Sequence, residues 1–119
     1  MLEENELVKV VSDELDLRKG ENITVIDVKG RTSVTDFMII VTAMSERHAK
    51  SLCGYVTDKL KEFGVRPLGL EGSDQGSDWV LLDLDNIIVH VMTAKARELY
   101  QLEKLWSIAS RSQETGMTP

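Results

Sequence analysis

The sequence predicts an α/β protein in which a mixed β-sheet of about five strands is flanked by helices on both faces. Two observations support this prediction. Segments with helical and strand-like periodicity follow one another in the order α-β-β-α-β-β-β-α. In addition, the segment from Asp36 to Thr42 (DFMIIVT) is continuously apolar in its middle, which is typical of a strand covered on both faces. We expect residues 1–110 to form a single domain and residues 111–119 to form a polar, frayed tail.

The first 31 residues predict a helix, a strand and a turn. In the segment 2–18, apolar side chains recur every fourth residue, at Leu7, Val11 and Leu15. This spacing places them on one face of an amphipathic helix, and Gly20 predicts its end. The segment from Asn22 to Val28 is rich in β-branched residues and predicts a strand, which Lys29 to Arg31 follow as a turn or bulge.

The middle of the chain predicts a second helix and a short strand. Ser45 is suited to cap the start of this helix, and Gly64 is suited to end it. The apolar residues of the helix fall on one face: Ala49, Leu52, Cys53, Val56, Leu60 and Phe63. The next segment, Val65 to Leu70, predicts a strand, and Pro67 within it favours a position at the sheet edge.

The last third predicts a hairpin and a helix. Glu71 to Asp78 is a polar, glycine-rich loop. Trp79 to Leu84 and Ile87 to Thr93 are strand-like runs joined by the turn formers Asp85-Asn86, as in a tight antiparallel hairpin. Thr93 is suited to cap a final helix. The apolar stripe predicted for that helix comprises Leu99, Leu102, Leu105, Trp106 and Ala109.

The charge balance restricts the class of partner. The chain has 20 acidic and 14 basic residues and a formal net charge of −6. Binding to free nucleic acid requires a basic surface, so we do not expect it. An acidic balance suits a basic protein partner, or it simply keeps a small protein soluble. The single cysteine, Cys53, the lack of a signal-peptide pattern and the lack of a long apolar run predict a soluble cytoplasmic protein that does not bind membranes.

Few side chains have the spacing of a metal or catalytic site. His48 and His90 are the only histidines and lie on different predicted elements. A zinc site needs three or four ligands, and the sequence offers no such set. Cys53 falls in the apolar stripe of its helix, where an inert thiol is expected. We therefore expect neither a metal nor another cofactor.

One enzymatic alternative remains, a metal-dependent nucleotidyltransferase. Gly72-Ser73 precedes Asp83 and Asp85, and such carboxylates can hold a divalent metal for phosphoryl transfer. Three features count against this reading. A strand rather than a helix follows Gly72-Ser73, Asp85 falls in the hairpin turn, and no Lys or Arg lies between residues 67 and 94. We therefore expect that the protein is not an enzyme.

A binding surface is the preferred interpretation of the same region. Trp79, Leu81 and Asp83 alternate along their strand and share one face, while the opposite face is purely apolar. Tryptophan is enriched at binding hot spots, and neighbouring acids such as Glu71 suit a basic partner. The alternative is an indole packed under a helix, with the acids merely solvated.

Between Gly30 and Trp106 the sequence resembles the ribosomal silencing factors, the Iojap-related proteins. The matching motifs are Ser33-Val34-Thr35-Asp36, Phe37 to Val41, Ser45-Glu46-Arg47-His48, Glu71-Gly72, Trp79, Asp83, Val89-His90-Val91, Arg97, and Tyr100-Gln101-Leu102-Glu103-Lys104-Leu105-Trp106. The family usually has Thr-Gly before the capping serine, whereas this chain has Thr42-Ala43-Met44-Ser45. Alanine tolerates a positive φ poorly, so we expect a different local turn before the helix.

The resemblance implies a function without covalent chemistry. Members of the family bind ribosomal protein number fourteen of the large subunit on the intersubunit face, block joining of the small subunit and lower translation when nutrients are short. The family fold is related in shape to nucleotidyltransferases, and members often crystallise as dimers, so the resemblance also implies a possible homodimer. The resemblance assigns partner binding to Trp79, Leu81 and Asp83, with Glu71 at the rim. Structural roles are expected for Arg47, His48, His90, Arg97, Tyr100 and Glu103.

Overall fold

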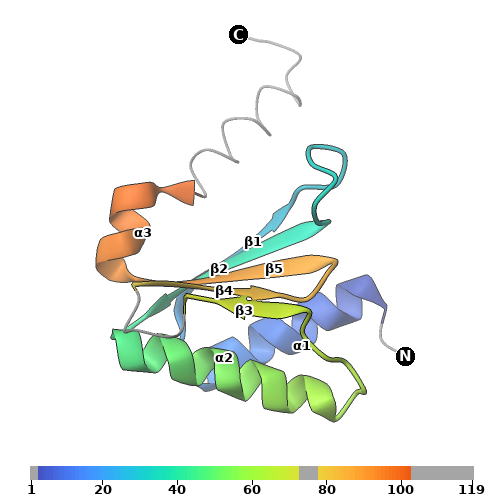
Figure 1. Ribbon diagram of the computed structural model, residues 1–119, viewed down its shortest axis with the longest axis horizontal. Helices are drawn as coiled ribbons and strands as arrows, with labels where there is room; N and C mark the ends of the chain where they lie inside the picture. The colour runs from blue at the N-terminus through green and yellow to red at the C-terminus, as the bar shows by residue number, and fades with distance from the viewer. Residues whose placement is uncertain (1–2, 73–77, 103–119) are drawn as a thin grey trace, which may run out of the picture.

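The computed structural model describes residues 3–72 and 78–102 (Figure 1). The elements follow the predicted order: α1 (Glu4–Leu17), β1 (Glu21–Asp27), β2 (Phe37–Ala43), α2 (Glu46–Lys61), β3 (Gly69–Glu71), β4 (Trp79–Asp83), β5 (Ile87–Thr93) and α3 (Ala94–Tyr100). The predicted α/β class is confirmed. No helix among the described residues is long and apolar enough to cross a membrane.

The five strands form one sheet in the order β1-β2-β5-β4-β3. The central pair, β2 and β5, is parallel, and the other three pairs are antiparallel, so the sheet is mixed as predicted. Both central strands are buried almost throughout, in keeping with the apolar sequence from Phe37 to Val41. The short strand β3 lies at the edge, as Pro67 indicated, although its three residues, Gly69–Glu71, lie later than predicted.

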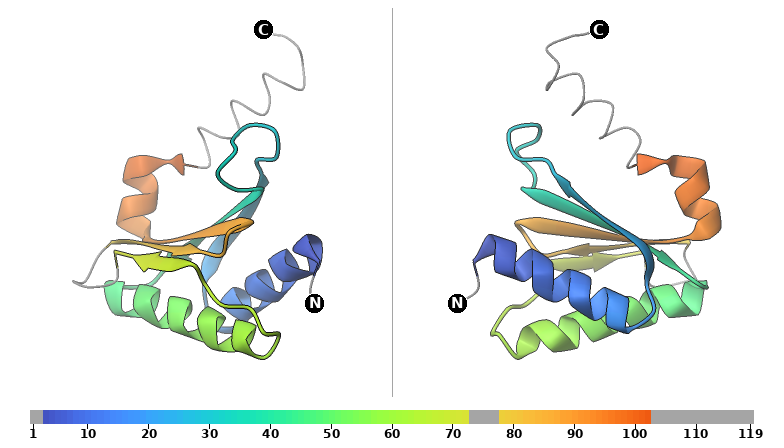
Figure 2. Two further views of the ribbon diagram at one scale, coloured as in Figure 1. Left: turned by 45° about the vertical axis from the view of Figure 1, so that its right-hand side comes forward. Right: turned by 180° about the vertical axis from the view of Figure 1, so that it is seen from behind.

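Helices cover both faces of the sheet, as predicted (Figures 1 and 2). α1 and α2 pack on one face, where the larger cluster of buried side chains joins both helices to β2, β4 and β5. α3 lies on the opposite face, over a smaller cluster formed by Ile40, Met92 and Ala96. The two faces of β4 therefore meet different surroundings: Val80 and Leu82 are buried beneath α1 and α2, and Trp79 packs on the α3 side.

The ends of α1 and α2 follow local rules. Ser45 caps α2, because its hydroxyl accepts the backbone N–H of His48 at 3.0 Å. Gly64 takes a left-handed φ of 74° just beyond α2, as predicted. At the end of α1 the left-handed residue is Lys19, with a φ of 71°, and not Gly20. Gly20 is required for close packing, since a Cβ there would lie 2.6 Å from Cγ2 of Val41.

Each of two predicted apolar stripes includes an exposed residue. α2 ends at Lys61, so Phe63 lies beyond it and is 41% exposed. α3 ends at Tyr100, because Gln101 adopts a left-handed conformation (φ 49°, ψ 48°). Leu99, predicted to face the core, is 69% exposed, while Leu102 packs against the α3-side cluster. The remaining predicted positions, Leu105, Trp106, Ala109 and the tail 111–119, lie outside the described residues.

Candidate partner-binding site

Strand β4 places the predicted binding residues on the α3 side of the sheet. Trp79, Leu81 and Asp83 are each half-buried, whereas Val80 and Leu82 between them are fully buried on the other side. This alternation is the one predicted from the sequence, and it follows from the period of two in a strand. The register of the β3–β4 pair aligns Glu71 with Leu81, which brings the fourth predicted residue onto the same face.

A shallow cavity marks the place where these side chains meet. It has a volume of about 240 Å³ and is lined by Glu71, Gly72, Trp79 and Leu81. Asp83 does not line it, because it lies at the other end of β4, aligned with Gly69. The structure thus brings three of the four predicted residues together around one depression, with the carboxyl group of Glu71 exposed at its edge.

The indole of Trp79 is held in place by two aromatic neighbours. Its Nε1–H donates a hydrogen bond to Nδ1 of His90 at 3.0 Å. Its ring centroid lies 4.7 Å from that of Tyr100 on α3 and 5.8 Å from that of His90. Trp79 also packs against the α3-side cluster. The indole is therefore partly packed beneath the end of α3 and partly accessible beside Leu81. It has features both of an indole packed under a helix and of a binding surface, the two interpretations drawn from the sequence.

His90 is the buried polar group of this site. Only 6% of its surface is exposed, and burial lowers its pKa from 6.5 to about 4. The imidazole is therefore neutral near pH 7. Because Nδ1 accepts the hydrogen bond from Trp79, the ring proton resides on Nε2, which is buried and has no hydrogen-bond partner among residues 3–72 and 78–102. The structural role expected for His90 is thus to orient Trp79.

The geometry gives little support to the nucleotidyltransferase alternative. Asp85 takes a left-handed φ of 76° in the β4–β5 turn, and its backbone N–H donates to Oδ1 of Asp83 at 2.9 Å. The Asp83 carboxylate therefore stabilises the turn. Ser73 lies outside the described residues. Within the ranges 3–72 and 78–102, no three His, Cys, Asp or Glu side chains are grouped so that they would hold a metal ion.

The contacts of His48 and Cys53 suit structural roles. Nδ1 of His48 accepts the backbone N–H of Met44 at 2.9 Å, and Nε2 lies 2.9 Å from the carbonyl oxygen of Arg18, so the ring joins the ends of α1 and α2. Neither Ala43 nor Met44 needs a positive φ, and α2 starts directly after Ser45. Cys53 is 2% exposed, and burial raises the pKa of its thiol to about 12, which suits the inert role predicted.

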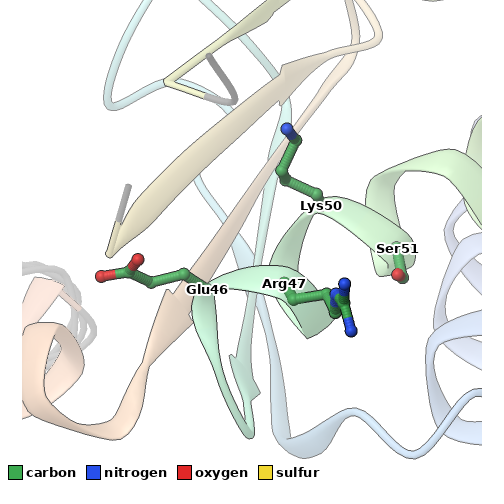
Figure 3. A pocket seen from close by; sticks show the side chains of 4 residues that line it. All are labelled: Glu46, Arg47, Lys50 and Ser51. Carbon is green, nitrogen blue, oxygen red and sulfur yellow. The ribbon is translucent and has the colours of Figure 1, made fainter. Parts of the chain in front are cut away.

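A second cavity, of about 440 Å³, lies along the start of α2 and is lined by Glu46, Arg47, Lys50 and Ser51. Figure 3 shows that the charged ends of Glu46, Arg47 and Lys50 point in three different directions. All four residues are exposed. Side chains that do not converge cannot surround one ligand, so the cavity near Trp79 is the better candidate for a binding site.

The fold and the cavity beside Trp79 define a small mixed-sheet α/β protein with a candidate binding face on β4. Residues 2–118 match the family described as "Ribosomal silencing factor during starvation". The chain belongs to this family, which confirms the resemblance drawn from its motifs.

Individual relatives agree with this assignment. The chain is 42% identical over 101 residues to "Ribosomal silencing factor RsfS" of Haemophilus influenzae, covering 85% of this chain and 98% of that protein. It is 33% identical to the mouse protein "Mitochondrial assembly of ribosomal large subunit protein 1", covering 76% of this chain and 41% of that protein. A crystal structure from Chromobacterium violaceum superimposes with a TM-score of 0.84 at 39% identity, covering 89% of this chain and 88% of that one.

Proposed function

We propose that this protein is cytoplasmic, binds the large ribosomal subunit through ribosomal protein number fourteen and thereby represses translation. Its membership in the ribosomal silencing factor family supports a role in silencing ribosomes. The observation that carries the proposed contact is the face of β4. There an accessible part of the Trp79 indole lies beside Leu81, Glu71 is aligned with Leu81, and Asp83 lies at the other end of the strand.

The chemistry of this face suits a basic protein surface. The indole and Leu81 offer apolar area in a depression, and such an anchor commonly dominates the binding energy of an interface. In the sequence, the stretch between residues 67 and 94 that carries these acidic side chains contains no Lys or Arg. An acidic rim favours a partner of opposite charge and speeds its encounter.

The proposed mechanism is steric and requires no covalent chemistry. A domain docked on the intersubunit face of the large subunit occupies space that the small subunit needs, so joining is blocked while the domain is bound. The protein acts in this proposal as a reversible binding protein and not as an enzyme. A homodimer would bury one surface of each copy and compete with the ribosome if that surface were the β4 face.

Co-sedimentation with purified ribosomal subunits tests the proposed binding. The protein should sediment with isolated large subunits and remain in the supernatant with small subunits. Leu81→Ala should reduce the bound fraction, because Leu81 lines the cavity. Val25→Ala is the matched control, since Val25 is an exposed apolar residue (44%) on the distant edge strand β1. Equal binding to both subunits, or equal binding by the two variants, would contradict the proposal.

A further inference from the structure

Helix α3 is too short to be stable by itself. It has seven residues, whereas isolated helices shorter than about 12–15 residues are marginal in water. Its position therefore depends on contacts with the sheet. At its start, the hydroxyl of Thr93 caps the helix by accepting the backbone N–H of Ala96 at 3.3 Å. The Ala96 side chain packs on Ile40 and Met92 of the central strands.

Arg97 supplies the polar attachment of α3 to the sheet. Its Nη1 donates to the hydroxyl of Thr42 at 2.9 Å and to the backbone carbonyl of Asn22, and its Nη2 donates to the hydroxyl of Thr24 at 2.7 Å. These three oxygens lie on β1 and β2. A planar guanidinium can donate to several oxygens in fixed directions, which an ammonium group on a flexible chain does not reproduce.

The C-terminal end of α3 meets the candidate binding face. Tyr100 lies three residues after Arg97, and its ring packs on the Trp79 indole of β4 with a centroid distance of 4.7 Å. Along the sheet, β1 and β2 stand on one side of β5, and β4 stands on the other. The side chains of Arg97 and Tyr100 thus join α3 to β1 and β2 on one side of β5 and to β4 on the other. Of the helices that the structure describes, α3 is the one on this face of the sheet (Figure 1).

We infer that Arg97 is a positioning residue of the partner-binding site: its bonds to β1 and β2 fix α3, and α3 in turn fixes Tyr100 against Trp79. The part of this inference that concerns binding rests on the proposed function. The part that concerns the geometry of Trp79 does not, and it can be tested without ribosomes.

Fluorescence quenching tests the geometric part. The chain has two tryptophans, so Trp106→Phe leaves Trp79 as the only indole emitter. In that background, Arg97→Gln should increase quenching of Trp79 by acrylamide by about twofold or more, because one side of the indole loses its cover. Tyr100→Ala, which removes the cover directly, should give a similar increase. Unchanged quenching in folded Arg97→Gln would overturn the inference.

Variants of Thr24 and Thr42, whose hydroxyl groups accept hydrogen bonds from Arg97, distinguish a change in the position of Trp79 from a loss of folding. Thr24→Val and Thr42→Val keep the shape of the side chain and remove one acceptor of Arg97 each, so both should increase quenching. Thr24→Ser and Thr42→Ser keep the hydroxyl and should show the same quenching of Trp79 as the protein with threonine at these positions. Adding Thr24→Val to Arg97→Gln should have little further effect, since both act through one contact. Additive effects, or serine variants that behave like valine variants, would overturn the inference.

Affinity for large subunits tests the part that concerns binding. Arg97→Gln and Thr24→Val should each weaken binding about fivefold, the size expected for a lost hydrogen bond that acts through Trp79. Increased quenching with unchanged affinity would overturn Arg97 as a positioning residue of the binding site. If the wild-type protein did not bind large subunits, the proposed function would fail, and the quenching experiment would still decide whether Arg97 positions Trp79.

Discussion

The indole Nε1–H of Trp79 donates a hydrogen bond to Nδ1 of His90, on the neighbouring strand, at 3.0 Å. This bond requires an imidazole that is neutral and carries its proton on Nε2. The burial that lowers the pKa of His90 to about 4 maintains that state over the physiological pH range. The orientation of the proposed binding residue is therefore linked to the protonation of a buried histidine.

The pKa of His90 predicts how stability depends on pH. The group has a pKa of 6.5 when unfolded and about 4 when folded, so between these values the unfolded chain binds more protons. Stability should be complete above pH 6.5 and should fall as the pH drops toward 4, by roughly 3 kcal/mol for a shift of this size. Urea unfolding at a series of pH values measures this dependence.

The variant His90→Asn isolates this contribution from that of the carboxylates. Asparagine places an acceptor oxygen near the position of Nδ1 and does not titrate. The free energy of unfolding of His90→Asn should therefore vary less between pH 4 and 6.5 than that of the wild type. Parallel pH profiles of the two proteins would show that His90 does not cause the dependence.

Cys53 should be almost unreactive in the folded protein. Its side chain is 2% exposed, and burial raises the pKa of its thiol to about 12, so little thiolate exists near pH 8. We expect an aromatic disulfide reagent to modify Cys53 at least about a hundredfold more slowly in the native protein than in concentrated denaturant. Similar rates in both conditions would refute this account of the thiol.

Trp79→Ala should weaken both binding and stability. Because the indole is half-buried, its loss should cost about 1–3 kcal/mol of stability, less than the ~3–5 kcal/mol of a fully buried tryptophan. An interface anchor should cost about thirtyfold or more in affinity for the large subunit. The matched control is Leu82→Ala on the buried face of the same strand, which should lower stability and spare binding. The account is wrong if the two variants bind equally well at equal folded fraction.

The association rate should depend on salt. Exposed charges are screened beyond about 8–10 Å near physiological ionic strength, so the rate should fall as salt is added. The double variant Glu71→Gln and Asp83→Asn should show a shallower dependence, because it removes the two predicted acidic residues of this face, one aligned with Leu81 and the other at the end of β4. Asp58→Asn, which changes an exposed acid on α2, is the control. Stopped-flow measurements with large subunits give the rates, and an unchanged slope in the double variant argues against steering by this face.

Much of the architecture was predictable because local patterns determine it. The apolar run from Phe37 to Val41 and the caps at Ser45 and Thr93 each act within a few residues, and the structure confirms them. The proximity of Trp79 and His90 was also accessible, because a two-residue turn at Asp85-Asn86 aligns Trp79 with Met92 and Leu81 with His90. The sequence analysis placed His90 in its strand without drawing that consequence.

The features that were missed have no local signal. Gln101 ends α3 in a left-handed conformation for which glycine is the usual signal, so the end of the helix at Tyr100 was not predicted. The Arg97 contacts join residues separated by 55, 73 and 75 positions in the sequence, which periodicity cannot reveal. The position of α3, and with it the environment of Trp79, follows from tertiary contacts.

A subunit-joining assay tests the central claim most directly. Purified large and small subunits are mixed under conditions that favour joining, with increasing amounts of this protein, and the joined fraction is measured by sedimentation. The account predicts that the wild-type protein lowers the joined fraction in a saturable way, and that Trp79→Ala requires a concentration about thirtyfold higher. A joined fraction that stays unchanged when the large subunit is saturated with the wild-type protein would contradict the account.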